Sequence, residues 1–101
     1  MTMLHTVNKS PFEKNSLSSC LAHAKEGSAI LLIEDGVYGA LKGSKMAAEV
    51  QDAMGKFTLY ALGPDLKARG IADKIIDGVK VIDYAGFVDL ACENDKVQSW
   101  L

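Results

Sequence analysis

Four short apolar segments recur along the chain, and each is bounded by residues that favour turns or helix starts. They lie at residues 4–7, 29–33, 57–62 and 79–82. Three of them are nearly continuous in Val, Ile and Leu instead of alternating with polar residues, which is typical of strands buried on both faces. The pattern therefore predicts a sheet that helices cover on both sides.

The segment after the first strand predicts a helix with two possible starts. Residues 10–13, Ser-Pro-Phe-Glu, fit a capping box with proline at the first helical position, whereas Asn15 or Ser16 is a competing cap. Apolar positions then recur at i, i+3, i+4 and i+7, and Gly27 ends the helix. This stripe consists of Leu17, Cys20, Leu21 and Ala24.

Three further helices are predicted. The second covers residues 45–54 with Ser44 as its cap, the third follows Pro64-Asp65 and ends at Gly70, and the fourth covers residues 84–93. We expect the second helix to bury Met46, Ala47, Val50, Ala53 and Met54. We expect the fourth to place on one side Tyr84, Phe87, Val88 and Ala91.

Strands that alternate with helices predict a parallel sheet with right-handed crossovers. The 101 residues suffice for one compact domain, and the sequence contains no internal repeat or linker. We therefore predict a single α/β domain over residues 1–101, doubly wound, with helices on both faces of a mainly parallel sheet of four or five strands. The pattern does not specify the order of the strands.

Composition narrows the function classes. Hydrophobic residues make up 49% of the chain and charged residues 24%, and 11 basic against 13 acidic residues give a net charge of −2. This balance argues against a strongly basic nucleic-acid-binding surface and leaves a small local basic patch open. It suits protein partners better than direct binding of nucleic acid. No apolar run reaches the about 18 residues of a membrane span, and the first residues lack the pattern of a secretory signal. We expect a cytoplasmic protein without a membrane segment.

The predicted carboxyl ends of the strands are the places where ligands bind in such folds. They carry small and acidic residues, namely Asn8-Lys9-Ser10, Glu34-Asp35-Gly36, Gly63-Pro64-Asp65 and Asp83, and no glycine-rich phosphate cradle. Glu34 and Asp35 are adjacent and should point to opposite faces, which disfavours a shared catalytic proton. A small-molecule-binding domain that uses this acidic crevice stays open as an alternative function.

Simple structural roles explain most of these residues. We interpret Asp35-Gly36 as a turn and Asp65 as a helix cap, because its side chain can accept from an early backbone N–H. The three glycines after the second strand have the wrong spacing for a phosphate loop, so we interpret them as turn residues; they are Gly36, Gly39 and Gly43.

The histidines predict neither a metal site nor a cofactor site. We interpret His5, inside the first strand, as a hydrogen-bonded core residue, and His23, on the first helix, as a partly solvated one. Neither has a Cys or Asp nearby at the spacing of metal ligands.

The cysteines are too few for a disulfide framework and too far apart for a zinc motif, so reduced thiols are expected. Cys20 is either a packed core thiol or a thiolate that accepts and passes on a sulfane sulfur, a role that requires solvent access and a lowered pKa. Cys92 lies beside Glu93 and Asp95 near a predicted helix C-terminus, where a thiolate is disfavoured. We interpret Cys92 as structural.

The tail of the chain contains its single tryptophan, Trp100. A tryptophan so near the terminus either folds back onto its own domain or anchors the chain in a partner protein. Both interpretations stay open.

Several segments, taken together, resemble the TusB/DsrH family over essentially the whole chain. They are residues 4–12 (LHTVNKSPF), 31–38 (LLIEDGVY), 62–70 (LGPDLKARG) and 81–90 (VIDYAGFVDL), and the ending Gln98…Trp100. The resemblance implies a DsrE-like α/β fold and a cytoplasmic heterohexamer with two copies of each of three related subunits.

The resemblance also implies a function and partners. The siblings would be DsrE/TusD-like and DsrF/TusC-like subunits, and the complex would exchange persulfide sulfur with DsrC/TusE-like or TusA-like carrier proteins. Such complexes serve 2-thiolation of the tRNA wobble uridine or sulfur oxidation, without a cofactor. The best-supported carrier cysteine of the family belongs to the DsrE/TusD subunit. Because many TusB sequences lack a cysteine at the position of Cys20, this residue indicates the DsrH side and is a candidate secondary sulfur carrier.

Overall fold

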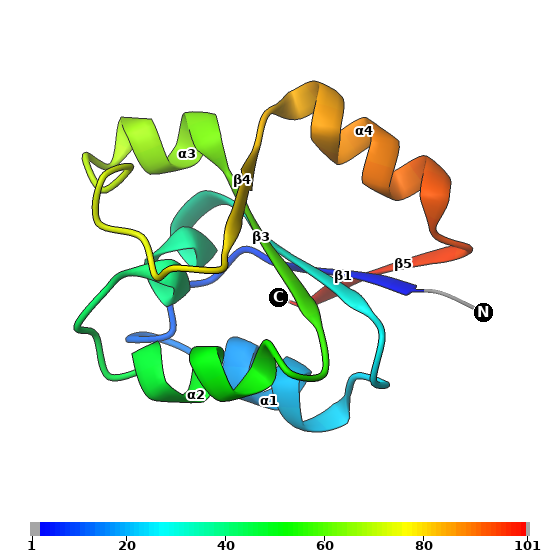
Figure 1. The fold of residues 1–101 in the computed structure, drawn as a ribbon, viewed down its shortest axis with the longest axis horizontal. Coiled ribbons are helices and arrows are strands. Elements are labelled where there is room, and N and C mark those ends of the chain that lie inside the picture. Colours follow the sequence, from blue (N-terminus) through cyan, green and yellow to red (C-terminus); the bar gives the residue numbers. More distant parts are fainter. Residues whose placement is uncertain (1–2, 101) are drawn as a thin grey trace.

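The computed structural model describes residues 3–100 and shows an all-parallel five-stranded sheet in the order β4-β3-β2-β1-β5 (Figure 1). This confirms the predicted doubly wound α/β class. The strands are β1 (Met3–Val7), β2 (Ala29–Leu32), β3 (Thr58–Leu62), β4 (Lys80–Ile82) and β5 (Lys96–Trp100). The helices are α1 (Ser16–His23), the 3-10 helix η1 (Glu34–Ala40), α2 (Ala47–Ala53), α3 (Gly63–Ala68) and α4 (Tyr84–Glu93).

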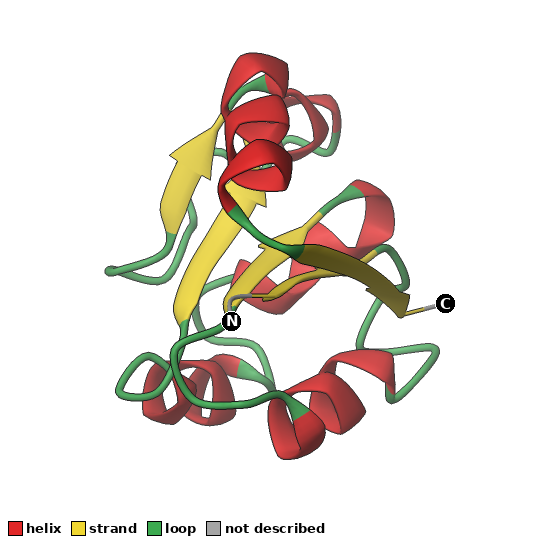
Figure 2. Ribbon diagram, turned by 90° about the vertical axis from the view of Figure 1, so that its right-hand side faces the viewer, coloured by secondary structure: helices red, strands yellow, loops and turns green. Residues whose placement is uncertain are grey.

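The strand order determines which face each helix covers. From β1 to β4 every crossover advances in the same direction, whereas the connection from β4 to β5 returns past the whole sheet to the far side of β1. Right-handed crossovers in opposite directions place their helices on opposite faces. Accordingly α1 and α2 lie on one side of the sheet and α4 on the other, as Figures 1 and 2 show.

The α1/α2 face carries the larger core. Alternate residues of the strands, such as Val7, Ile30 and Leu59, meet Leu17 of α1 and Val50 of α2 in a cluster of sixteen buried side chains among the described residues. The inward positions predicted for the second helix are confirmed, because Met46, Val50 and Ala53 are buried and Ala47 and Met54 pack against this cluster.

The α4 face carries a smaller core, in which four of the described residues are buried, namely Leu4, Ala29, Leu31 and Leu90. The bounds predicted for the last helix are confirmed, but half of its predicted inward side is wrong. Phe87 and Ala91 pack against the cluster, whereas Tyr84 and Val88 are 60% and 61% exposed. Within residues 3–100, α4 is the helix that covers this face, so its side chains beside the line of contact with the sheet have no second helix to pack against.

The first helix begins at the later of its two predicted starts. Ser10 forms a turn, in which its hydroxyl accepts from the Phe12 N–H at 3.2 Å and its carbonyl accepts from the Lys14 N–H at 3.0 Å. This turn does not continue into α1, whose N-cap is Asn15. Phe12 is 54% exposed, so the turn does not bury this aromatic side chain in the core.

Two other expectations of local structure are wrong. Ser44 does not cap the second helix, which begins at Ala47. Gly36 and Gly39 lie within η1, where a side chain would overlap the Val7 carbonyl at the first position and Leu17 at the second. These two glycines permit close packing, and Gly43, with φ +74°, is the turn residue of the three.

Candidate functional site

The carboxyl ends of β2 and β3 are joined by ion pairs. Asp35 Oδ1 accepts from Arg69 Nε at 3.0 Å and from Nη2 at 2.8 Å, and Asp65 lies 4.0 Å from Arg69 Nη1. The hydrogen bond to Asp35 raises the pKa of Arg69. Both carboxylates therefore serve a salt bridge that ties η1 to α3.

Asp65 does not cap α3 as predicted. Its Oδ2 accepts from the Glu34 N–H at 2.7 Å, and α3 has no side-chain cap. This bond holds the start of η1, where Glu34 has the positive φ of +49° that non-glycine residues rarely adopt. Where an acidic ligand-binding crevice was predicted, the carboxylate of Asp65 instead connects α3 to η1.

A shallow depression of ≈ 490 Å³ lies further along the same edge, beside β4. Gly63 and Asp83 line it, and Asp83 Oδ1 accepts from the Gly86 N–H at 2.9 Å as the N-cap of α4. The carboxylate that lines this depression is therefore already engaged by the fold.

Cys20 is fully buried within the larger core. Burial raises the pKa of the Cys20 thiol to about 12, because the apolar surroundings disfavour the charged thiolate. Neither condition for a sulfur-carrying thiolate, solvent access or a lowered pKa, is present at Cys20. The structure favours the packed core thiol among the two interpretations.

Cys92 occupies the opposite environment from the one expected. Its side chain is exposed near the end of α4, so it is not a packed structural residue. The helix carries Tyr84, Val88 and Cys92 at i, i+4 and i+8, which places the thiol in line with the two exposed apolar side chains.

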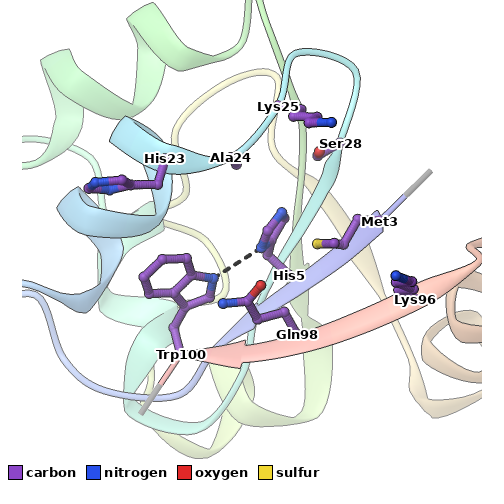
Figure 3. A pocket seen from close by; sticks show the side chains of 9 residues that line it. All are labelled: Met3, His5, His23, Ala24, Lys25, Ser28, Lys96, Gln98 and Trp100. Carbon is purple, nitrogen blue, oxygen red and sulfur yellow. Dashed lines mark hydrogen bonds between the residues drawn. The ribbon is translucent and has the colours of Figure 1, made fainter. Parts of the chain in front are cut away.

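His5 and Trp100 meet across the edge of the sheet. The Trp100 Nε1–H donates to His5 Nδ1 at 3.0 Å, and the ring centroids lie 6.1 Å apart (Figure 3). His5 is 4% exposed, and this burial lowers its pKa. Trp100 is half-buried and packs against the larger core. The tail therefore folds back onto its own domain, and the use of Trp100 as an anchor for a partner stays a prediction.

A cavity of ≈ 440 Å³ surrounds this pair and is the candidate functional site; we call it the edge pocket (Figure 3). Its floor is formed by alternate residues of β1 and β5, and its wall by the end of α1 and the loop before β2. The pocket lies where the end of α1 and the loop that follows it face β1 and β5, two strands that α1 contacts. The lining residues are Met3, His5, His23, Ala24, Lys25, Ser28, Lys96, Gln98 and Trp100.

The sequence pattern assigns these residues to separate elements and does not predict the edge pocket. The parallel pairing of β1 with β5 brings His5 opposite Gln98 and Met3 opposite Lys96. One signal was present, namely the spacing of Lys96, Gln98 and Trp100 by two residues, which puts them on one face of a strand. His23 is exposed as expected, and its Nδ1 bonds the Ser19 carbonyl at 2.8 Å.

Residues 3–100 hold no group of three His, Cys, Asp or Glu side chains placed to bind a metal ion. Over the same residues, no helix has the length and apolar character needed to span a membrane. The fold and the site define a small, all-parallel doubly wound α/β domain with a buried thiol and a pocket at one edge of its sheet.

Comparison with known proteins shows the family. The family described as "DsrH like protein" matches residues 9–97. The chain is 39% identical over 98 residues to Protein TusB of Pectobacterium parmentieri and 35% identical to Protein TusB of Escherichia coli, covering 97% of this chain and 100% of each relative. The chain belongs to the TusB/DsrH family, as its sequence segments indicated.

Solved structures show the same fold. The ychN protein of Escherichia coli superposes with a TM-score of 0.83 at 18% identity, covering 98% of both chains. A protein of unknown function from Methanobacterium thermoautotrophicum superposes with a TM-score of 0.75 at 15% identity, covering 97% of both chains. At these identities the likeness concerns the fold.

Proposed function

We propose that this chain is a subunit of a cytoplasmic sulfur-relay heterohexamer of the DsrEFH/TusBCD type. The observation that carries the proposal is the similarity to TusB proteins over their whole length. Its partners would be DsrE/TusD-like and DsrF/TusC-like subunits. The complex would exchange sulfur with DsrC/TusE-like or TusA-like carrier proteins. The transferred sulfur would serve sulfur oxidation or 2-thiolation of the tRNA wobble uridine.

The chemistry of such a relay is persulfide exchange. A thiolate attacks the outer sulfur of a donor persulfide, a new S–S bond forms, the old S–S bond breaks, and the donor leaves as a thiolate. The exchange requires no cofactor and no external oxidant. It requires two thiols to meet, so subunits without a reactive thiol contribute by holding the reacting ones in position.

The buried state of Cys20 supports an accessory role for this chain. A thiol with a pKa of about 12 is almost entirely protonated at neutral pH, whereas the thiolate is the nucleophile. Cys20 would therefore not be the reactive thiol of the relay, and we propose that a sibling subunit supplies it.

The exposed apolar residues of α4 support assembly with other subunits. Tyr84 and Val88 lie one turn apart on this helix, and we call them the α4 patch. Val97 of β5, which pairs with Leu4 and so faces the same side of the sheet, is 50% exposed. We propose that a sibling subunit covers the α4 patch, since burying exposed apolar side chains is favourable and such side chains grouped on one surface mark interaction sites.

Co-expression tests this assembly. With both siblings the native chain should elute from a size-exclusion column as one hexameric peak. Tyr84→Ala/Val88→Asp should remove the chain from that peak, because a charge at the interface would be buried without a partner. The matched control is Asp89→Asn, an exposed position on the same helix. A native chain that stays monomeric in the presence of both siblings would contradict the proposal.

The alternative is that the chain is itself a sulfurtransferase and carries sulfur on Cys20. Incubation with a persulfide donor followed by intact-mass measurement distinguishes the two functions. Our proposal predicts no added sulfur on Cys20 in the native chain. The measurement is repeated with Cys92→Ser, so that sulfur added to the exposed Cys92 thiol does not contribute to the mass. A sulfur adduct that disappears in Cys20→Ser would establish the alternative.

A further inference from the structure

The proposed function makes no use of the edge pocket. With ≈ 440 Å³ it lies within the range of about 300–1,000 Å³ that small-molecule sites occupy. It is framed by secondary structure on two sides, since β1 and β5 form its floor and the end of α1 its wall (Figure 3). A cavity of this size on a rigid frame is suited to a small ligand.

The charged side chains among the described residues that line the pocket are all basic. Lys25 comes from the loop after α1 and Lys96 from the start of β5, and none of the lining residues is Asp or Glu. The chain as a whole carries a net charge of −2, so this local excess runs against its overall balance. Two ammonium groups at one cavity raise the local concentration of anions.

His5 adds a fixed hydrogen-bond donor. Because its Nδ1 accepts the Trp100 Nε1–H, the neutral ring carries its own proton on Nε2. Figure 3 shows this second nitrogen on the side of the ring turned away from Trp100. Burial lowers the pKa of His5, which keeps the ring in this neutral, donating form.

The remaining lining combines neutral polar groups with apolar surface. Ser28 and Gln98 provide a hydroxyl and an amide, whereas Met3, Ala24 and the Trp100 indole are apolar. An inorganic anion would leave this apolar surface uncovered. A ligand with an apolar body and one anionic group matches both parts of the lining.

We propose that the edge pocket binds a small organic anion, whose charged group is held by Lys25, Lys96 and the His5 Nε2–H and whose apolar body packs against Trp100. This inference is independent of the sulfur-relay proposal. A chain that binds the anion but joins no hexamer would support the anion site and contradict the sulfur-relay proposal.

Benzoate is a suitable probe, and the single tryptophan of the chain supplies the signal. Titration with benzoate should change the Trp100 fluorescence saturably, and the neutral isostere benzamide should bind about tenfold more weakly. Added salt should weaken benzoate binding, because exposed lysines are screened. Equal affinity for benzoate and benzamide, or no saturable response to benzoate, would overturn the proposal.

A pair of double variants separates the pocket from net charge. Lys25→Gln/Lys96→Gln should weaken benzoate binding about tenfold and leave benzamide unchanged. Lys45→Gln/Lys80→Gln has the same net charge but alters exposed lysines outside the pocket, so it should bind benzoate like the native chain. Retained affinity in the first variant, or an equal loss in both, would show that these lysines do not form an anion site.

Discussion

The two faces of the sheet differ in how completely helices cover them. The α1/α2 face buries sixteen of the described residues in one cluster, including Cys20, whereas the α4 face buries four and leaves Tyr84 and Val88 exposed. The strand order explains the asymmetry, because three crossovers pass over the first face and one over the second. We infer that one face stabilises the domain and the other is available for partners.

The largest expected effect concerns the well-covered face. Leu32→Ala removes a side chain that is 1% exposed from the middle strand of the sheet. We expect a loss of about 3–5 kcal/mol in the free energy of unfolding, from lost burial and from the cavity left behind. Urea denaturation measures it. A loss below about 1 kcal/mol would show that this face is less tightly packed than the structure indicates.

The corresponding change on the other face should cost less. Leu90→Ala removes the central contact of α4 with Leu4 and Leu31. We expect about 2 kcal/mol, the lower end of the usual range, since the small cluster lies close to solvent and water can reach the vacated space. The same urea titration compares the two variants directly. A larger loss for Leu90→Ala than for Leu32→Ala would reverse the comparison.

The exposed residues of the α4 face should matter little to folding. Tyr84→Ala/Val88→Ala should lower the free energy of unfolding of the isolated chain by less than about 0.5 kcal/mol for each substitution, because both side chains already contact water. The same variant should lose its place in the hexameric peak with the siblings. A fully assembled variant would show that partners dock elsewhere.

The smallest effect is a dependence on pH. The folded pKa of His5 lies below its unfolded value, so the unfolded chain binds this proton more readily. Its contribution to stability is therefore constant at neutral and higher pH and is lost as pH falls through the unfolded pKa. Urea titrations at pH 7.5 and 5.5 should show a drop that is smaller in His5→Gln. An equal drop in both chains would assign the effect to other groups.

The strands and helices were predictable where local pattern and burial coincide. β2 is wholly apolar and wholly buried, and α4 has the predicted bounds of residues 84–93. β5 escaped the pattern because an edge strand needs no apolar run, and its residues are mostly exposed. The 3-10 helix η1 also escaped, because its start is held by hydrogen bonds from the Ile33 and Glu34 N–H groups to the Val7 carbonyl and the Asp65 side chain, which lie far away in the sequence.

The candidate site was harder to predict for the same reason. His5 and Trp100 are 95 positions apart, and their hydrogen bond exists because β5 pairs with β1. The inward side of α4 was also beyond local reasoning. Tyr84 and Phe87 are both aromatic, and the line along which α4 crosses the sheet decides which of them packs. The partners of Trp100 and the buried side of α4 thus depend on how these elements lie relative to distant strands, which composition and spacing do not specify.

We infer that this chain contributes a docking surface to a relay whose reactive thiol belongs to a sibling. The direct measurement is the rate of persulfide sulfur transfer by the purified siblings with this chain present, absent, or replaced by Cys20→Ser. We expect omission to slow transfer at least about tenfold, because positioning is lost, and Cys20→Ser to restore the full rate. Siblings that transfer sulfur equally fast without this chain would contradict the claim.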